Sequence, residues 1–198
     1  MLVLASASPR RQELLRNAGI PFTVQPADIN EALRAGEDPK EYAERLAREK
    51  ALTVFQTGSH NYVLGADTVV VVDGAILGKP RDASDATRML RLLSGRTHTV
   101  ITGVCLMAKR AVGGQRSVAS GSEQLRTASE TTLVTMNELS DDEIREYVAT
   151  GEPMDKAGAY AIQGIASRWI PRIEGDYSNV VGLPVSMVYG MLRERGAV

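Results

Sequence analysis

The chain has 198 residues, enough for a full hydrophobic core, and 43 % of them are apolar and 24 % charged. Its 23 basic and 24 acidic side chains give a net charge of −1, which argues against a general nucleic-acid binder because such proteins carry a basic excess. The single cysteine, Cys105, excludes an intrachain disulfide and a cysteine-rich zinc site. No apolar run reaches the roughly 18 residues of a membrane span, and the first residues do not resemble a signal peptide. We therefore expect a cytoplasmic protein without a membrane partner.

The N-terminal residues 1–5 predict a short buried strand that runs directly into a helix. Ser8 is a good N-cap for this helix, and Gly19 suits its C-terminal end. Free backbone N–H groups at a helix N-terminus favour a bound anion. Arg10 and Arg11 stand in the first turn, where they oppose the helix dipole. We interpret this unfavourable placement as a sign of an anionic ligand rather than of a solvated pair.

A second helix begins at Asp38, which is a suitable N-cap, and its buried face includes Leu46 and Val54. Lys50 falls on the same face, four residues from each of these. Two interpretations stay open: the side chain snorkels from the edge of the apolar stripe, or it points into a cleft to meet phosphate or carboxylate. Glu31 lies in the irregular, acidic stretch before this helix, and its context alone indicates a surface residue.

The stretch from residue 63 to residue 82 predicts a β-hairpin. Residues 69–72 are four consecutive valines, which favour a buried strand, and Asp73-Gly74 is a preferred pair for a two-residue turn. Asp67 interrupts the apolar run, and a buried carboxylate is costly unless it is paired or bound to a metal. Lys79 and Arg81 follow on the return arm. The hairpin therefore predicts one acid opposite two bases, a site for an anion and a metal.

The rest of the chain alternates helix and strand patterns. The glycine- and serine-rich residues 111–122 indicate a loop, and the small residues within 155–164 let backbone approach a ligand closely. The other segments predict helices at 82–93, at 140–151 with a capping box, and from 183 onward, and strands at 97–107, at 124–136 and, as an edge strand, at 169–173.

Several familiar motifs are absent on inspection. The run from Gly74 to Pro80 is one residue too short between its glycines for a phosphate loop, and it has proline where serine or threonine holds magnesium. His60 and His98 lack the spacing of zinc ligands, and neither has the context of a serine-hydrolase triad. The residues alone therefore indicate an α/β protein with acids that can hold a divalent metal and with a phosphate pocket formed by Ser8, Arg10, Arg11, Lys79 and Arg81.

Seven short motifs, in order along nearly the whole chain, resemble those of the Maf family of nucleoside triphosphate pyrophosphatases. Each motif alone is weak, but the set is specific. The motifs are Leu4-Ala5-Ser6-Ala7-Ser8-Pro9-Arg10-Arg11, Arg48-Glu49-Lys50-Ala51, Gly65-Ala66-Asp67-Thr68, Gly78-Lys79-Pro80-Arg81-Asp82, Leu93-Ser94-Gly95, the segment 155–164, and Val181-Gly182-Leu183-Pro184.

This resemblance implies a Maf/ITPase-like α/β fold. Residues 1–198 would form a single domain of two lobes, with an elongated, twisted mixed sheet flanked by helices and a central cleft. It also implies a homodimer that hydrolyses a nucleoside triphosphate to the monophosphate and pyrophosphate with Mg²⁺ or Mn²⁺. Carried over by position, Asp67 is the catalytic proton acceptor, Glu31 and Asp67 hold the metal, Ser8, Arg11, Lys50 and Lys79 contact phosphate, and Arg10, Thr68 and Gln163 select the substrate.

The amino-acid sequence of residues 157–164 resembles that of the branch of the family that acts on dTTP and UTP. The Gln163 amide offers the hydrogen-bond donor and acceptors that suit the edge of a pyrimidine base. Two alternatives remain: the branch that acts on 7-methyl-GTP, and a non-catalytic nucleotide-binding regulator of cell division, since the family is associated with septum formation. The sequence does not decide between pool cleansing and division control.

Overall fold

The computed structural model describes residues 1–109 and 124–198, so the predicted loop at 111–122 lies outside the described residues. The strands are β1 (Leu2–Leu4), β2 (Phe22–Val24), β3 (Tyr62–Val72), β4 (Ala75–Leu77), β5 (Thr97–Ala108), β6 (Gln124–Thr135) and β7 (Arg172–Glu174). The helices are α1 (Pro9–Asn17), α2 (Pro39–Gln56), α3 (Ala83–Leu93), α4 (Asp141–Ala149), α5 (Tyr177–Val181) and α6 (Val185–Glu194). Three short 3₁₀ helices are η1 (Glu152–Asp155), η2 (Ala157–Ala159) and η3 (Ile165–Trp169).

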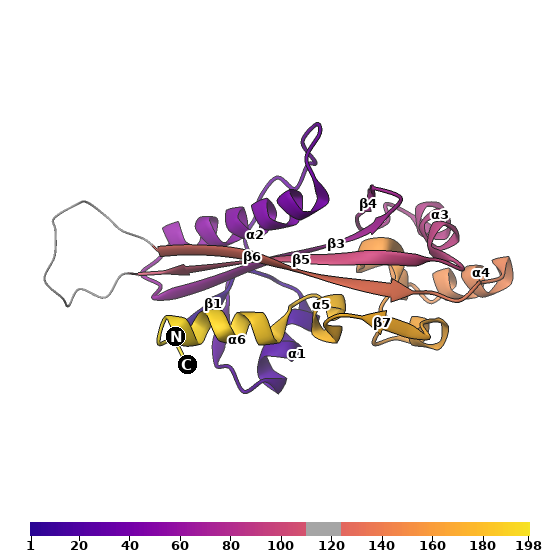
Figure 1. Cartoon of the computed structure of the whole chain (residues 1–198). Helices are drawn as coiled ribbons and strands as arrows, with labels where there is room; N and C mark the ends of the chain where they lie inside the picture. The colour runs from indigo at the N-terminus through magenta and orange to yellow at the C-terminus, as the bar shows by residue number, and fades with distance from the viewer. Residues whose placement is uncertain (110–123) are drawn as a thin grey trace, which may run out of the picture.

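The seven strands of the described residues join one mixed sheet. Its order is β2-β1-β3-β5-β6-β7, and β4 pairs with β3 beside this path. Strand β1 pairs parallel with both β2 and β3. The other pairings, β3–β4, β3–β5, β5–β6 and β6–β7, are antiparallel. Figure 1 shows that the long strands β3, β5 and β6 make an elongated, twisted sheet with helices on both faces. This confirms the predicted α/β fold with a mixed sheet.

The local signals in the sequence placed most helix ends correctly. The Ser8 side chain caps α1 by accepting from the Arg11 backbone N–H, and Ser140 with Glu143 forms the predicted capping box of α4. Asp73 and Gly74 both have positive φ, as the predicted two-residue turn requires. These features depend on residues that are neighbours along the chain, which is why the sequence reveals them.

Two short elements were not predicted, and one strand differs from its prediction. The weak pattern around Phe22 did not indicate β2, and no pattern indicated α5. An edge strand was predicted at 169–173. In the structure Trp169 ends η3, and only Arg172–Glu174 pairs with β6. The short strands β2 and β7 are defined by their partners in the sheet, because three residues carry too little pattern to indicate a strand.

Helix α2 lies directly on the sheet because two glycines leave room for it. A Cβ on Gly65 would lie 2.1 Å from the Ala47 carbonyl oxygen, and a Cβ on Gly103 would lie 2.4 Å from that of Ala43. Ala43, Ala47 and Ala51 are fully buried in this contact. The close approach brings the side of α2 that carries Lys50 against β3, the strand that carries Asp67.

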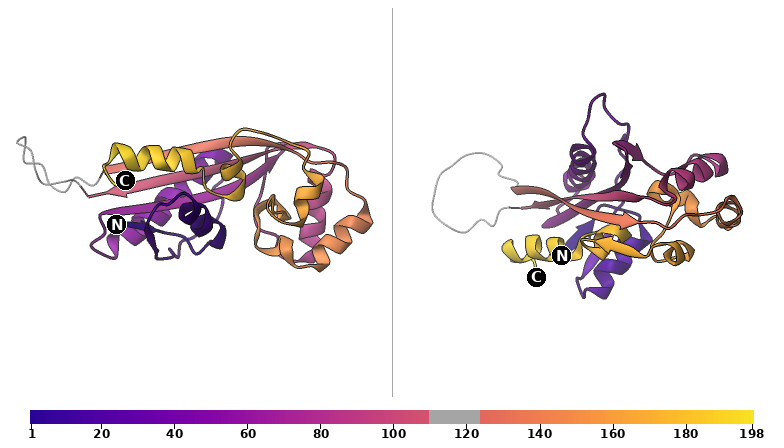
Figure 2. Two further views of the ribbon diagram at one scale, coloured as in Figure 1. Left: turned by 90° about the horizontal axis from the view of Figure 1, so that it is seen from below. Right: turned by 45° about the vertical axis from the view of Figure 1, so that its right-hand side comes forward.

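The helices form two groups along the long strands. Figure 2 shows α1, α6 and the N-terminal strands around one end, and α3, α4 and the 3₁₀ helices gathered at the other end. Separate hydrophobic clusters underlie the two groups, one centred on residues such as Leu15 and Leu192 and the other on Leu90 and Tyr147. That the chain is one domain of two lobes stays a prediction. Among residues 1–109 and 124–198, no helix combines the length and apolar character needed to cross a bilayer.

Candidate active site

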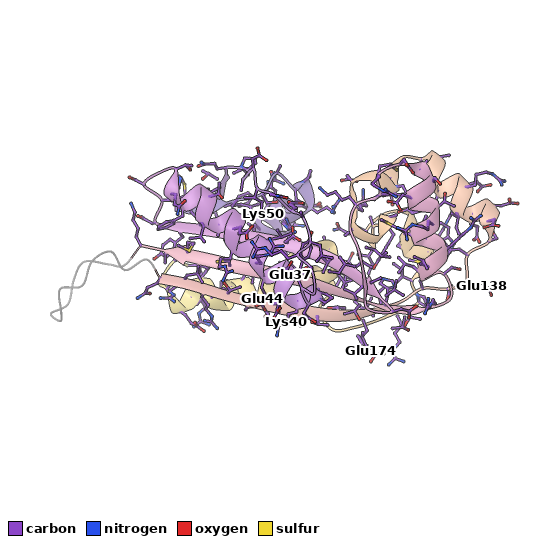
Figure 3. The ribbon with its side chains drawn as sticks, turned by 90° about the horizontal axis from the view of Figure 1, so that it is seen from above. Glu37, Lys40, Glu44, Lys50, Glu138 and Glu174 are labelled. Carbon is purple, nitrogen blue, oxygen red and sulfur yellow. The ribbon has the colours of Figure 1, made fainter. Side chains whose placement is uncertain are left out.

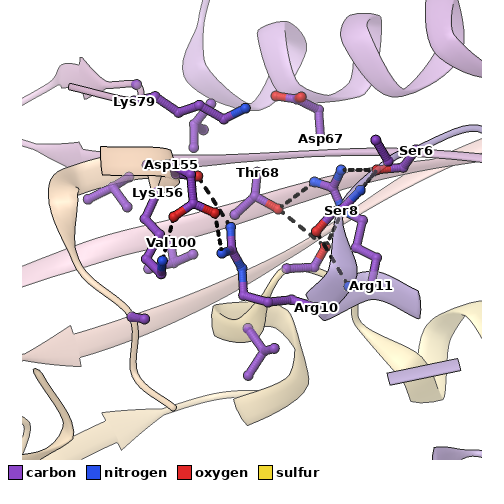
Figure 4. Close-up of a pocket in the computed structure, with 18 of the residues that line it drawn as sticks. Ser6, Ser8, Arg10, Arg11, Asp67, Thr68, Lys79, Val100, Asp155 and Lys156 are labelled. Atoms are coloured by element: carbon purple, nitrogen blue, oxygen red, sulfur yellow. Dashed lines mark hydrogen bonds and ion pairs between the residues drawn. The ribbon is translucent and has the colours of Figure 1, made fainter. Parts of the chain in front are cut away.

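A pocket of about 560 Å³ opens where the β1–α1 turn, strand β3, the residues after β4 and the η1–η2 segment meet. Its lining contains five basic side chains and three acidic ones, so the pocket is positively charged although the chain as a whole is nearly neutral. Figure 4 shows how several of these side chains converge. Every site residue carried over from the resemblance lines this pocket: Ser8, Arg10, Arg11, Glu31, Lys50, Asp67, Thr68, Lys79 and Gln163.

The Lys50 side chain lies between two carboxylates. Its Nζ atom is 2.6 Å from Oδ1 of Asp67 and 2.6 Å from Oε1 of Glu31. Lys50 is only 8 % exposed, so of the two open interpretations the structure supports the lysine that points into a cleft. Burial alone would raise the pKa of Glu31, but the hydrogen bond and charge of Lys50, with further help from Lys79 and Arg11, lower that pKa below its usual range.

The loop that carries Glu31 is fastened to α2. The Tyr42 hydroxyl donates to the Glu31 carbonyl oxygen at 2.7 Å, and Arg45 donates to the Ala32 carbonyl oxygen at 3.1 Å. Arg45 also makes two hydrogen bonds to the Glu37 carboxylate, at 2.5 and 2.8 Å, and this contact lowers the pKa of Glu37 to about 2. Figure 3 shows Glu37 beside α2, on which Lys50 also lies. An irregular loop is thereby held over a precise position on the pocket wall.

Arg11 is buried and joins three segments of the chain. Its guanidinium donates to the Gly182 carbonyl oxygen at 2.8 Å, to Ser6 Oγ at 3.1 Å and to Thr68 Oγ1 at 3.1 Å. Thr68 also lies 2.9 Å from Thr102 Oγ1 on the neighbouring strand. Arg11 therefore organises the floor of the pocket, and its predicted contact with phosphate would come from the guanidinium donors that remain.

Arg10 points across the pocket mouth to the other group of helices. Its guanidinium lies 3.1 Å from Oδ2 of Asp155 and 3.4 Å from the Asp155 carbonyl oxygen. Asp155 is also paired with Lys156, whose Nζ donates to Oδ1 at 2.5 Å. Figure 4 shows this chain of charges beside Thr68 and Lys79. Arg10 is thus positioned at the pocket, but an internal carboxylate occupies part of its hydrogen-bonding capacity.

The hairpin prediction was correct for its turn and wrong for one of its bases. The β3–β4 pairing stops at Leu77, opposite Val70, and the chain then leaves the sheet at Gly78. Lys79 still reaches the pocket, and its ammonium points toward Asp67 in Figure 4. Arg81 does not: its side chain is 84 % exposed and pairs with Asp85 on α3. Because the β3–β4 ladder ends at Leu77, Asp67 has no partner on the return arm, and the strand that it pairs with is β5, at Gly103.

The remaining wall comes from residues 157–163 and from Tyr160 in particular. The Tyr160 hydroxyl lies 2.8 Å from Nε2 of His98, which is buried behind it. Burial lowers the pKa of His98 to about 4, so this histidine is neutral. It supports the pocket wall through its contact with Tyr160 and does not itself line the pocket. Gln163 is exposed and lines the pocket beyond Tyr160. The predicted substrate-selecting amide therefore lies on the surface of a turn.

A family model described as Maf-like protein matches residues 1–195 of this chain. The chain belongs to the Maf family. A protein of Koribacter versatilis is 55 % identical over 197 residues, which cover 100 % of this chain and 95 % of that protein. Proteins of Geobacter sp. strain M21 and of Symbiobacterium thermophilum are each 50 % identical, covering 100 % and 98 % of this chain and 96 % and 94 % of theirs. All three relatives are named dTTP/UTP pyrophosphatase.

Three polar residues that hold side chains of this Maf protein's pocket were not singled out from the sequence; Ser6 and Asp155 line the pocket, and Thr102 lies buried behind Thr68. Ser6 accepts from Arg11, Thr102 contacts Thr68, and Asp155 holds Arg10. Ser6 had a usable signal, since it follows the buried first strand directly. Thr102 is a fully buried hydroxyl within an apolar strand, which also required a partner. The pairing of Asp155 with Arg10 had no local signal, because 145 residues separate them.

The Maf resemblance implies a divalent metal, and the donor set fits one. In the part of the chain that the structure describes, no three His, Cys, Asp or Glu side chains cluster in a way that could hold an ion. Mg²⁺, however, is commonly bound through one or two carboxylates together with substrate phosphates and water. Glu31 and Asp67 already converge on a single cation, the Lys50 ammonium. Two carboxylates that share one cationic position are suited to Mg²⁺ or Mn²⁺ once a triphosphate completes the coordination.

Proposed function

We propose that this Maf protein hydrolyses dTTP and UTP to the nucleoside monophosphate and pyrophosphate. The observation that carries the proposal is that all nine site residues expected of such an enzyme line one positively charged pocket. The names of the full-length relatives support the same activity. They do not favour the 7-methyl-GTP branch or a non-catalytic regulator.

In this proposal the basic side chains bind and orient the triphosphate. Lys50, Lys79, Arg10 and the free donors of Arg11 neutralise phosphate charge, which is the main requirement of phosphoryl transfer. Ser8 adds a hydroxyl at the N-terminus of α1, where backbone N–H groups also favour an anion. The pocket thereby has more cationic than anionic side chains to compensate for a highly charged substrate.

Asp67 is the proposed proton acceptor. A water oxygen attacks phosphorus, the bond between the α- and β-phosphates breaks, and the proton of the water passes to the Asp67 carboxylate. Glu31 and Asp67 would hold Mg²⁺ or Mn²⁺, which supplies charge neutralisation and a lower pKa for a nearby water. In the structure Lys50 is bonded to both carboxylates, and this contact orients them toward the point where the metal would be held.

Substrate choice is assigned to Arg10, Thr68 and Gln163. Thr68 lies on β3 directly after Asp67, and its hydroxyl is fixed by Arg11 and Thr102. The Gln163 amide can donate and accept hydrogen bonds, as the edge of a pyrimidine base requires. These residues surround the phosphate site from different elements, so base and phosphate would be read by separate parts of the pocket.

A nucleotide panel tests the proposal. Purified protein would be incubated with dTTP, UTP, CTP, GTP and 7-methyl-GTP, each with Mg²⁺, with Mn²⁺ and with excess EDTA, and the products identified by ³¹P NMR. We expect pyrophosphate from dTTP and UTP with either metal, and none with EDTA. Orthophosphate as the first product would overturn the assigned bond, and exclusive cleavage of 7-methyl-GTP would move the protein to the other branch.

Homodimerisation and a part in septum formation follow from the resemblance, and a cytoplasmic location was expected from the sequence; we keep all three as proposals. Light scattering coupled to size-exclusion chromatography tests the first, since a dimer should have twice the chain mass of 21.3 kDa. A predominantly monomeric protein at enzyme concentrations would contradict it.

A further inference from the structure

The turn that carries Gln163 is fastened at both ends by two side chains from outside the pocket. At one end the Ala161 backbone N–H donates to the Tyr147 hydroxyl at 3.3 Å. At the other end the Ile165 backbone N–H donates to Glu152, at 3.1 Å to Oε1 and 3.3 Å to Oε2. Gln163 lies midway between these two anchored positions. Its backbone position therefore depends on Tyr147 and Glu152.

The two anchoring side chains are bonded to each other and to the core. The Tyr147 hydroxyl donates to Glu152 Oε1 at 2.9 Å, and the Tyr147 ring packs edge-on against Trp169 with 5.3 Å between ring centroids. Burial, with a further contribution from Glu152, raises the pKa of Tyr147, so its hydroxyl keeps the proton that it donates. The hydroxyl thus accepts from the turn while it donates to the second anchor.

The Glu152 carboxylate is also in tight contact with the turn itself. A Cβ added to Gly164 would lie only 2.2 Å from Glu152 Oε1, so a side chain at residue 164 would displace the carboxylate. Neither Tyr147 nor Glu152 is among the residues that line the pocket. The hydrogen bonds that these two side chains make toward the pocket go to the backbone of residues 161 and 165.

We propose that Tyr147 and Glu152 are positioning residues that set the discrimination between nucleobases by fixing the turn that presents Gln163. This inference rests on the proposed function, because it assumes that Gln163 reads the base. The phosphate-binding side chains come from the β1–α1 turn, α1, α2 and the segment after β4, whereas the side chains of the pair hydrogen-bond to each other and to the backbone of residues 161 and 165. Loss of the pair should therefore relax base selection much more than it slows phosphate chemistry.

The test measures kcat and KM for UTP and GTP in Tyr147→Phe and Glu152→Ala. Tyr147→Phe keeps the ring that packs on Trp169 and removes only the hydroxyl. It therefore tests the loss of the anchor even if Glu152→Ala fails to fold. We expect the ratio of kcat/KM for UTP to that for GTP to fall about tenfold in both variants, mainly through a higher KM for UTP. Glu152→Gln retains an oxygen at Oε1 and should restore most of the ratio.

Two controls separate positioning from general structural damage. Glu146→Ala removes an exposed carboxylate from α4, the helix that carries Tyr147, and the ratio should not change. A Gln163→Ala background should abolish the effect of Tyr147→Phe on the ratio, because the two changes act through one contact with the base. Equal losses for UTP and GTP, with an unchanged ratio, would overturn the inference.

The proposed function and this inference fail in different ways. If the wild-type protein releases no pyrophosphate from any pyrimidine triphosphate, the proposed function is wrong. If it cleaves UTP without preferring it to GTP, or if it prefers UTP and both anchor variants keep that preference, the activity stands and the positioning role is wrong.

Discussion

The Lys50 ammonium lies 2.6 Å from Oδ1 of Asp67, and it is equally close to Glu31. This arrangement joins a helix, a strand and an irregular loop at one buried cation. Lysine and carboxylate groups that are taken out of water need such partners, since an unpaired buried charge is expensive. The same three groups are those proposed to meet the triphosphate and its metal.

Lys50→Met should slow hydrolysis of UTP about 100-fold, because it removes a cation from the phosphate site. It should also raise the pKa of Glu31, since Lys50 is the main group that holds that pKa down against the effect of burial. Steady-state kinetics and a ¹³C NMR titration of the Glu31 carboxyl measure the two effects. Lys40→Met, an exposed position on the same helix, should change neither. An unaltered Glu31 titration in Lys50→Met would contradict the contact.

Asp67→Asn should reduce turnover by about 10²- to 10⁴-fold while nucleotide binding survives. The amide keeps an oxygen that can accept from Lys50, but it cannot take a proton from water. Calorimetric titration with an uncleavable imido analogue of dTTP measures binding separately from turnover. Asp73→Asn, in the turn of the same hairpin, should leave turnover intact. Normal turnover in Asp67→Asn would remove this residue from the mechanism.

Asp155→Asn should tighten binding of the uncleavable dTTP analogue two- to fivefold. The ion pair with Arg10 is partly exposed, with side chains 28 % and 64 % accessible, and such pairs contribute about 0.2–1 kcal/mol. Without Asp155, Arg10 is free to bind phosphate without first breaking that pair. Asp141→Asn breaks the exposed Arg91–Asp141 pair outside the pocket and should have no effect on binding. Weaker binding in Asp155→Asn would show instead that the carboxylate helps to hold the nucleotide or its metal.

Glu37→Gln should flatten the dependence of stability on pH in acid. Arg45 lowers the pKa of Glu37 from 4.5 to about 2, so the native state holds this carboxylate ionised where the unfolded chain would protonate it. The resulting stabilisation is complete above pH 4.5 and is lost as pH falls toward 2. Thermal unfolding between pH 2.5 and 7 measures it, with the exposed Glu138→Gln as control. Parallel curves for wild type and Glu37→Gln would exclude the contribution.

Gly65→Ala should destabilise the fold by about 3 kcal/mol, because its Cβ would overlap the Ala47 carbonyl oxygen at 2.1 Å and force α2 away from the sheet. Turnover should fall as well, since Lys50 moves with the helix. Gly190→Ala is the matched control: nothing lies within 4 Å of its added Cβ in α6, where alanine is the better helix former. Urea denaturation compares the two. Equal stability of both variants would refute the close contact between α2 and β3.

Much of the architecture was predictable from local patterns. Neighbouring residues in the sequence specify the helix caps at Ser8 and Ser140, the turn at Asp73-Gly74 and the apolar face of α2. The resemblance then added Glu31 and Gln163, whose own contexts gave no hint of a pocket. Arg81 shows what a local pattern does not contain: its position two residues beyond Lys79 looks equivalent in the sequence, but the ladder has already ended at Leu77.

The sequence by itself determined the α/β class and most of the helix and strand positions, and its resemblance to the Maf family pointed to nine of the residues that line the pocket. Only the tertiary structure decided that Lys50 lies between Glu31 and Asp67, that Asp155 holds Arg10, and that Tyr147 and Glu152 fasten the turn of Gln163. Caps and turns are bonds between near neighbours, so a single segment specifies them. A pocket is made of bonds between distant segments, and these exist only once the sheet register and the packing of α2 on its glycines have set which atoms meet.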